Sequence, residues 1–144
     1  MKTEPVAISI TLSDLVICEQ GTGKNSLIGC FNNYNFLRFP AAPPPFYITA
    51  SLTNLDPEVK EFDVTARIED PINGMVLASM GAHIQLREPF VLTKNTIIDV
   101  PMIGMPFVFQ KPSNYLIIVL VNNNQVGKRP LTVCAVTAPS NPPV

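Results

Sequence analysis

Residues 113–136 read SNYLIIVLVNNNQVGKRPLTVCAV, and they carry the clearest strand-and-turn pattern in the chain. Residues 115–121 form an unbroken apolar run rich in Ile and Val, too short for a helix that must also cap itself. Four polar residues follow at 122–125, and Asn tolerates the positive φ of a tight turn. Apolar residues then recur at strand-like spacing, namely Val126, Leu131 and Val133. The stretch predicts a β-hairpin with Pro130 at an edge or a bulge, where no amide donor is needed.

The first strand of this hairpin is apolar at successive positions, so it should be a central strand covered on both faces. Two earlier stretches, 46–54 and 62–69, alternate apolar and polar residues, as half-buried strands do. Their inward residues would be Phe46, Ile48, Ala50 and Leu52 in the first, and Phe62, Val64, Ala66 and Ile68 in the second. Turns are expected at 55–59 and at 70–74, where Pro71 and Asn73-Gly74 occur.

The remaining strands carry irregularities that predict bends and edges. Residues 6–18 alternate, but the apolar phase slips near Ser13-Asp14, which predicts a bulge or a bend there. Residues 26–36 are expected to form one strand interrupted by Gly29, followed by a proline-rich crossover at 38–45. Residues 75–85 should form another strand, and residues 96–103 an edge strand because Pro101 interrupts them. The sum is an all-β chain, an antiparallel β-sandwich of about eight strands.

Composition supports one globular domain, expected over residues 1–137, with a flexible proline-rich tail at 138–144. The 144 residues carry a net charge of −1, which gives no sign of binding to nucleic acid or to an anionic membrane. No signal peptide or membrane-spanning helix is expected. The three cysteines, Cys18, Cys30 and Cys134, are widely spaced, so we expect buried, reduced thiols and a cytoplasmic location.

Four motifs could suggest chemistry, and each has a simpler interpretation. Residues 21–25 (GTGKN) lack the glycine and the Ser or Thr of a phosphate-binding loop, and they predict a hairpin turn. The cysteines and His83 could supply zinc ligands, but no Cys-x-x-Cys pair occurs. His83, the only histidine, is expected on a polar strand face with no nucleophile elbow nearby. The acids at 56–58 and 69–70 are too few at either turn for a calcium cage, so neither a metal nor a cofactor is expected.

A candidate interaction surface comes from the loops. If every connection reverses the chain, turns 20–25, 55–59, 86–94 and 122–125 share one end of the sandwich, and loops 37–45, 70–74 and 104–112 share the other. The second end would gather a large apolar load, with Leu37, Phe39, Pro43, Pro44, Phe107 and Phe109 as its main members. These residues would either form an exposed interaction surface or plug the open end of the core. Edge strands are the second candidate surface.

Several segments together resemble a family of small bacterial proteins of unknown function. They are residues 14–16, 26–31, 39–40, 67–71, 125–127 and 129–131, together with the strand that begins at Tyr115. The resemblance covers nearly the whole chain. It implies an immunoglobulin-like β-sandwich, and it brings no catalytic residue because the shared motifs are turns and core positions.

We therefore expect a non-enzymatic protein whose role is self-association or docking onto a protein partner. The alternative is a small-ligand or carbohydrate-binding module that uses the polar residues Asn33, Tyr34, Asn35 and Tyr47. Since the chain contains no Trp, a stacking platform for a sugar would have to come from Tyr. A hydrolase is the third possibility, and it would depend on His83.

Overall fold

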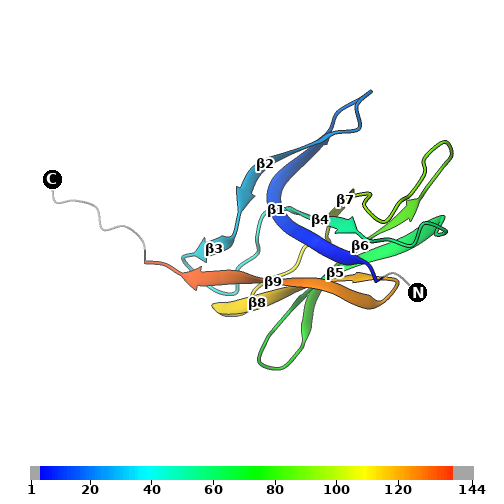
Figure 1. The fold of residues 1–144 in the computed structure, drawn as a ribbon. Coiled ribbons are helices and arrows are strands. Elements are labelled where there is room, and N and C mark those ends of the chain that lie inside the picture. The colour runs from blue at the N-terminus through cyan, green and yellow to red at the C-terminus, as the bar shows by residue number, and fades with distance from the viewer. Residues whose placement is uncertain (1–3, 138–144) are drawn as a thin grey trace.

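The computed structural model describes residues 4–137, which form two β-sheets packed face to face without a helix in that part (Figure 1). In chain order the strands are β1 (Val6–Cys18), β2 (Asn25–Phe31), β3 (Asn33–Phe36), β4 (Tyr47–Thr53), β5 (Glu61–Glu69), β6 (Val76–Gln85), β7 (Ile98–Ile103), β8 (Ser113–Val121) and β9 (Asn124–Ala135). The all-β prediction is therefore confirmed. The tail predicted at 138–144 lies outside the described residues.

The four-stranded sheet has the order β2-β1-β4-β7, and the five-stranded sheet has the order β3-β9-β8-β5-β6. Every neighbouring pair is antiparallel except β3 and β9, which run parallel. Nine strands appear among residues 4–137 instead of eight, because residues 26–36 form two strands and not one. The chain changes sheet at Asn32, between β2 and β3.

The predicted hairpin of β8 and β9 is confirmed, but its turn is two residues long instead of four, because β9 already begins at Asn124. Asn122 and Asn123 both have positive φ, 46° and 68°, as a two-residue hairpin turn requires. β8 lies between β9 and β5, which confirms that it is a central strand. Pro130 lies in the part of β9 that β3 does not reach, since β3 pairs only with residues 132–135. The missing amide of Pro130 therefore sits on an open edge.

The core lies between the two sheets and uses the predicted inward faces. All eight inward residues predicted on β4, its flanking Phe46 and β5 are buried. The turn at 70–74 is confirmed, with the Gly74 amide donating to the Asp70 carbonyl at 2.8 Å. β7 is an edge strand that contains Pro101, also as predicted. Alternation of apolar and polar residues thus identified the buried side of β4 and of β5.

Of the two alternatives predicted near Ser13-Asp14, a bulge is wrong, whereas β1 does bend away from the sandwich there. β1 shifts register against β4 between Ala7 and Ser9, which turns Ile8 outward and brings Ile10 and Leu12 toward the core. No register shift occurs at Ser13 and Asp14, where β1 and β2 stay in one register. The apolar phase changes there because β1 leaves the sandwich, so its side chains no longer have a core to face.

The second half of β1 pairs with β2 and forms a two-stranded ribbon that projects from the body (Figure 1). We call this ribbon, residues 14–31, the arm. Ser13 is the last β1 residue that pairs with β4, opposite Tyr47. The arm therefore leaves the sandwich at the end where β4 begins.

The predicted grouping of the turns was wrong in one respect. Turn 20–25 lies at the tip of the arm, on the side of loop 37–45, and not with turns 55–59 and 122–125. The assumption that failed was that 26–36 is a single reversing strand. β3 instead runs parallel to β9, because the chain reverses at Asn32. We call the end formed by loops 37–46, 70–75 and 104–112 the apolar end. No helix in residues 4–137 is both long and apolar enough to span a membrane.

Candidate functional site

The apolar end is filled by a cluster of aromatic rings. Phe109 lies at its centre, with ring centroids 4.9 Å from Tyr115, 5.0 Å from Phe107 and 6.2 Å from Tyr34. Further rings extend the cluster, namely Phe31, Phe36, Phe39 and Phe46. Loop 104–112 is held to loop 37–45 by two backbone hydrogen bonds between Phe109 and Ala41, at 2.8 and 2.9 Å. The cluster closes this end of the core.

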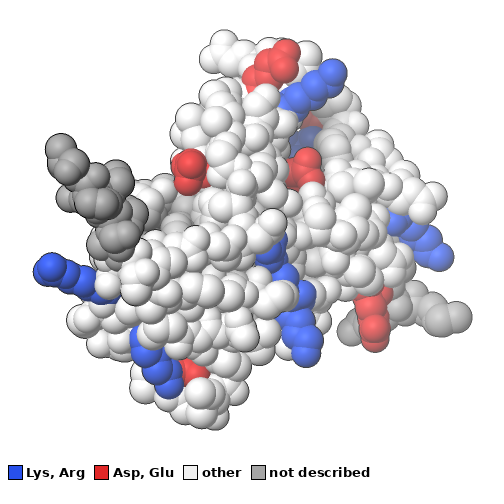
Figure 2. All heavy atoms as spheres, turned by 90° about the vertical axis from the view of Figure 1, so that its left-hand side faces the viewer, with Lys and Arg blue, Asp and Glu red and all other residues white. Residues whose placement is uncertain are grey.

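The six predicted surface residues therefore divide into two groups. Phe109 is completely buried, and Phe39 and Phe107 are half-buried against the core. Leu37 is 61% exposed, and Pro44 is also exposed beside half-buried Pro43. The rings thus act as a plug, while the rim of this end stays apolar and open to solvent. Figure 2 shows this side of the molecule, on which charged side chains are few and scattered.

An apolar groove of about 240 Å³ opens beside the plug, where β6 and β7 form the open side of the sandwich. Met80 and Phe107 line its inner part, and Ile103 and Met105 its rim. Met105 is 80% exposed, although sequence analysis did not single it out. The signal was available, since residues 102–109 are almost entirely apolar for a loop and a strand end.

The arm exposes apolar side chains on one face. Leu15 lies directly opposite Ile28 in the β1–β2 register, and Ile17 lies two residues further along the same face. Leu15, Ile17 and Ile28 are 44%, 47% and 47% exposed. On the other edge of β1, residues 14–18 have no backbone partner among residues 4–137, because β4 ends its pairing at Ser13. The arm thus combines an open strand edge with an apolar face.

Arg129 fixes the base of the arm to the sandwich. Its Nη1 donates to the Ile10 carbonyl at 2.8 Å, and its Nη2 donates to Oδ1 of Asn32 at 2.9 Å. Burial lowers the pKa of the Arg129 guanidinium. A single side chain of β9 therefore holds both β1 and the corner where the chain changes sheet, so the arm starts from a rigid base.

Residues 8–134 match the sequence profile described as a family of unknown function (DUF6941). The chain belongs to this family. A comparison with curated proteins finds no match. The family match spans both sheets and includes the arm and the apolar end, but it assigns a role to none of their residues.

The other sequence motifs have mostly structural roles. Residues 19–24 form the turn at the tip of the arm, where the Glu19 amide donates to the Lys24 carbonyl at 2.8 Å and a strand follows, as predicted. Asp56 and Asp70 each accept a backbone amide two residues on, at 3.0 and 2.9 Å, which confirms them as turn-forming acids. Within residues 4–137, no group of three or more His, Cys, Asp or Glu side chains is arranged so that it could hold a metal ion.

The prediction of buried cysteines is wrong, since none of the three is fully buried. Cys18 and Cys30 are exposed and Cys134 is half-buried, and all three are free thiols. Cys18 and Cys30 lie on the arm, where only one sheet layer is present, so nothing covers them. Apolar neighbours in the sequence do not bury a side chain when the strand itself has left the core.

His83 lies on the outer face of β6, as predicted, between two carboxylates of β5. Its Nδ1 is 2.6 Å from Oδ1 of Asp63 and its Nε2 is 3.2 Å from Oε2 of Glu61. Hydrogen bonds to Asp63 and then to Glu61 raise the pKa of His83. Both ring nitrogens are taken up by carboxylates, so the imidazole is held as one member of an exposed charge cluster.

The polar residues of the carbohydrate alternative are not brought together. Tyr34 packs into the aromatic cluster, and its buried hydroxyl has no hydrogen-bond partner in the described part of the chain. Burial, with a smaller contribution from the charge of Asp14, raises the pKa of Tyr34 far above its usual range. Tyr47 belongs to the other sheet, and Asn33 and Asn35 are exposed on β3. The ring of Tyr34 is thus not free to stack on a sugar.

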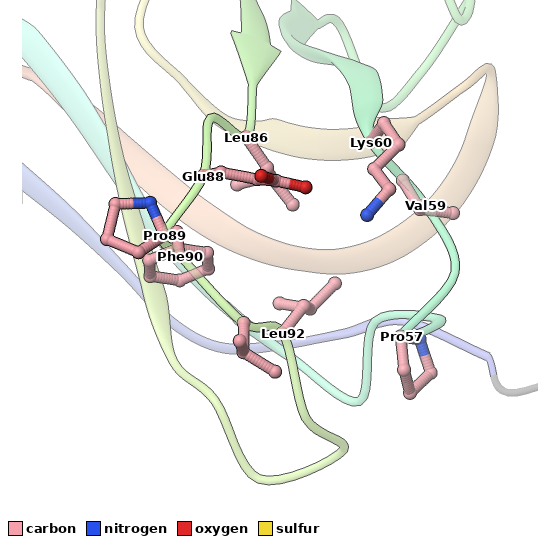
Figure 3. Close-up of a pocket in the computed structure, with 9 residues that line it drawn as sticks. Pro57, Val59, Lys60, Leu86, Glu88, Pro89, Phe90 and Leu92 are labelled. Atoms are coloured by element: carbon pink, nitrogen blue, oxygen red, sulfur yellow. The ribbon is translucent and has the colours of Figure 1, made fainter.

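A pocket that sequence analysis missed lies at the end opposite the apolar end. It measures about 370 Å³ and is enclosed by loop 55–60 and loop 86–97 (Figure 3). Seven of the nine residues that line it are apolar, while Lys60 and Glu88 bring opposite charges into it from the two loops. The run Pro89-Phe90-Val91-Leu92, apolar for a connecting loop, was the signal that could have found it.

Proposed function

We propose that the chain is a non-enzymatic, self-associating β-sandwich whose copies pair through their arms. The observation that carries this proposal is the open edge of β1 at residues 14–18, next to the exposed side chains of Leu15 and Ile17. An unpaired strand edge is a template for pairing with another chain, and proteins usually block such edges with charges, prolines or covering loops. Residues 14–18 (DLVIC) carry a single charge and no proline.

The sequence of this edge suits a symmetric partner. If two copies pair antiparallel about Val16, Leu15 of one copy lies opposite Ile17 of the other, and Val16 lies opposite itself. Asp14 then lies opposite Cys18 and not opposite a second Asp14. Apolar residues therefore meet apolar residues, and the only charge on the segment meets a thiol. Pairing of this kind would extend the four-stranded sheet continuously from one copy into the next.

The magnitudes predict a weak association. Fully burying one Leu or Ile contributes roughly 1.5–3 kcal/mol, and about half of each side chain is already covered, so the four residues of a symmetric pair contribute about 3–6 kcal/mol. Each new backbone hydrogen bond adds about 0.5–1.5 kcal/mol. The loss of translational and rotational freedom opposes this with at least about 4 kcal/mol. We therefore expect dimers at micromolar to millimolar concentration and monomers below it.

The test is a mass measurement by light scattering after size exclusion over a series of loading concentrations. The wild type should shift toward twice its monomer mass as concentration rises. Val16→Lys would place two like charges opposite each other, and it should stay monomeric at every concentration. Val91→Lys, an exposed substitution at the other end, is the matched control and should behave like the wild type. A variant Val16→Lys that dimerises as well as the wild type would contradict the proposal.

We further propose that the sandwich is immunoglobulin-like. Two features support this. The sheet of β9, β8, β5 and β6 has the order G-F-C-C′ of a variable-type domain, and β1, β4 and β7 have the order A-B-E. Tyr115, near the start of β8, donates its hydroxyl to the Lys111 carbonyl at 2.6 Å, which is the arrangement of the tyrosine corner. The exposed thiols of Cys18 and Cys30 favour a reducing compartment such as the cytoplasm.

A further inference from the structure

The pocket between loops 55–60 and 86–97 has the features of a small-molecule site. Its volume of about 370 Å³ falls at the small end of the range of roughly 300–1,000 Å³ that ligand pockets occupy. Leu92 is buried at its base, Val59 and Leu86 are half-buried, and Phe90 stands exposed at the rim. The site lies at the opposite end of the sandwich from the arm, so it is independent of the proposed self-association.

The walls of the pocket are held in place by hydrogen bonds to the sandwich. The Leu86 amide donates to the Lys60 carbonyl at 2.8 Å, which joins the two loops where they leave β5 and β6. At the far side, the Asn54 amide donates to the Lys94 carbonyl at 3.1 Å. Within the longer loop, the Thr93 amide donates to Oγ1 of Thr96 at 2.9 Å. Because these hydrogen bonds already fix both loops, binding of a ligand would require little additional ordering of the pocket.

Two opposite charges face each other across this space. Lys60 and Glu88 are the only charged residues among the nine that line the pocket. Their side chains reach in from different loops and point toward each other (Figure 3). Neither takes part in an ion pair with any residue in the range 4–137. The pocket therefore presents one free cation and one free anion above an apolar base.

We propose that this pocket binds a free α-amino acid with an apolar side chain. Its carboxylate would pair with Lys60, its ammonium with Glu88, and its side chain would pack on Leu92 and its apolar neighbours. A neutral apolar molecule would cover both charges without giving either a partner, which is costly. A ligand with a single charge would satisfy one group and be repelled by the other. Only a molecule that carries both charges and an apolar body satisfies the whole site.

Titration calorimetry with L-leucine tests the ligand class. L-leucine should bind, whereas N-acetyl-L-leucine, which lacks the ammonium, and L-leucine amide, which lacks the carboxylate, should each bind at least roughly tenfold more weakly. Glycine, which has no apolar side chain, should also bind more weakly. If the wild type binds neither L-leucine, D-leucine nor L-phenylalanine at millimolar concentration, or if it binds the two blocked derivatives as well as L-leucine, the proposal is wrong.

A charge exchange tests the two residues. Lys60→Glu and Glu88→Lys should each weaken binding at least roughly tenfold, because each leaves two like charges in the pocket. The double variant Lys60→Glu/Glu88→Lys should restore binding. Exchanging the ammonium and carboxylate positions around an α-carbon interconverts enantiomers, so the double variant should prefer the enantiomer of leucine that the wild type binds less well.

The exposed Lys128→Glu is the matched control and should bind like the wild type. All three charged positions are exposed, so circular dichroism and the thermal midpoint should show intact folds, and Lys60→Met serves if Lys60→Glu does not fold. Wild-type affinity in both single variants, or a double variant that binds no better than they do, would overturn the assignment.

Discussion

Phe109→Ala tests whether the aromatic residues of the apolar end are core or surface. The side chain of Phe109 is fully buried, and it packs against the rings of Phe107 and Tyr115 at 5.0 and 4.9 Å. Truncating a buried Phe to Ala removes these contacts and leaves a cavity, which costs about 3–5 kcal/mol. Domains of this kind are stable by roughly 5–15 kcal/mol, so the variant should lose a large fraction of its free energy of unfolding.

The matched control is Leu37→Ala. Leu37 is 61% exposed at the same end, so its truncation should change the free energy of unfolding by no more than about 0.5 kcal/mol. The assay is urea unfolding followed by circular dichroism, with the slope of the free energy against urea concentration compared between variants. Thermal unfolding provides a second readout, since 1 kcal/mol shifts the midpoint by roughly 2–4 °C for a chain near this length.

Equal and small losses in Phe109→Ala and Leu37→Ala would contradict the prediction, because they would place Phe109 outside the cooperative core. A large loss of unfolding free energy in Leu37→Ala would also contradict the prediction, since the exposed rim would then be part of the plug. The expected difference, several kcal/mol against almost none, is well above the error of the extrapolation.

Three further predictions concern the arm, the hairpin and the histidine. Gly29 has a φ of +68°, and a Cβ there would lie 2.9 Å from Cγ of Asp14. Gly29→Ala should therefore lower the free energy of unfolding, measured by urea unfolding, by more than about 1 kcal/mol. Adding Asp14→Ser in a double variant should restore part of this loss. Asn122→Ala removes the side-chain oxygen that accepts a hydrogen bond from the Asp63 amide of β5 at 3.0 Å, and it keeps an unfavourable positive φ. The free energy of unfolding should fall by about 1–3 kcal/mol in the same assay. An unchanged urea midpoint would contradict this. The pKa of His83 is raised by its two carboxylate neighbours, so its contribution to stability is fully present below the unfolded value of 6.5 and is lost as pH rises through the folded value. The difference in thermal midpoint between the wild type and His83→Asn should therefore be larger at pH 5 than at pH 8.5, and a difference independent of pH would rule this out.

The sheets of the body could be predicted from local patterns. Alternation in residues 46–54 and 62–69 reports directly which face of a half-buried strand is inward, and Asn at 122 and 123 reports the turn. These signals are contained in a few consecutive residues. They therefore survive without any knowledge of the partner strands.

The arm could not be predicted in the same way, because it depends on contacts between distant residues. Residues 26–36 have the composition of one strand, and only the pairing of β3 with β9 shows that the chain reverses at Asn32. Cys18 and Cys30 have apolar neighbours like those of core residues, yet no second sheet covers them. The sequence does show that the apolar positions of β1 shift by one residue near Ser13-Asp14. Such a shift has more than one possible cause, however, and here it arises because the strand leaves the core.

The candidate site was predicted only in part. The loops that form the apolar end were correctly brought together, but sequence alone did not distinguish buried Phe109 from exposed Leu37, since both are large apolar residues in proline-rich loops. The pocket at the other end escaped notice because its two charges, Lys60 and Glu88, are distant in the sequence and ordinary in composition. The two side chains face each other only because the fold places loops 55–60 and 86–97 side by side.

The most direct test of the central proposal is the mass of the wild type and of Val16→Lys in solution, measured by light scattering across a range of concentrations. Pairing through the arms predicts that the wild type approaches the mass of a dimer as concentration rises, while Val16→Lys remains a monomer throughout. A wild type that stays monomeric up to millimolar concentration, or a Val16→Lys variant that dimerises equally well, would contradict it.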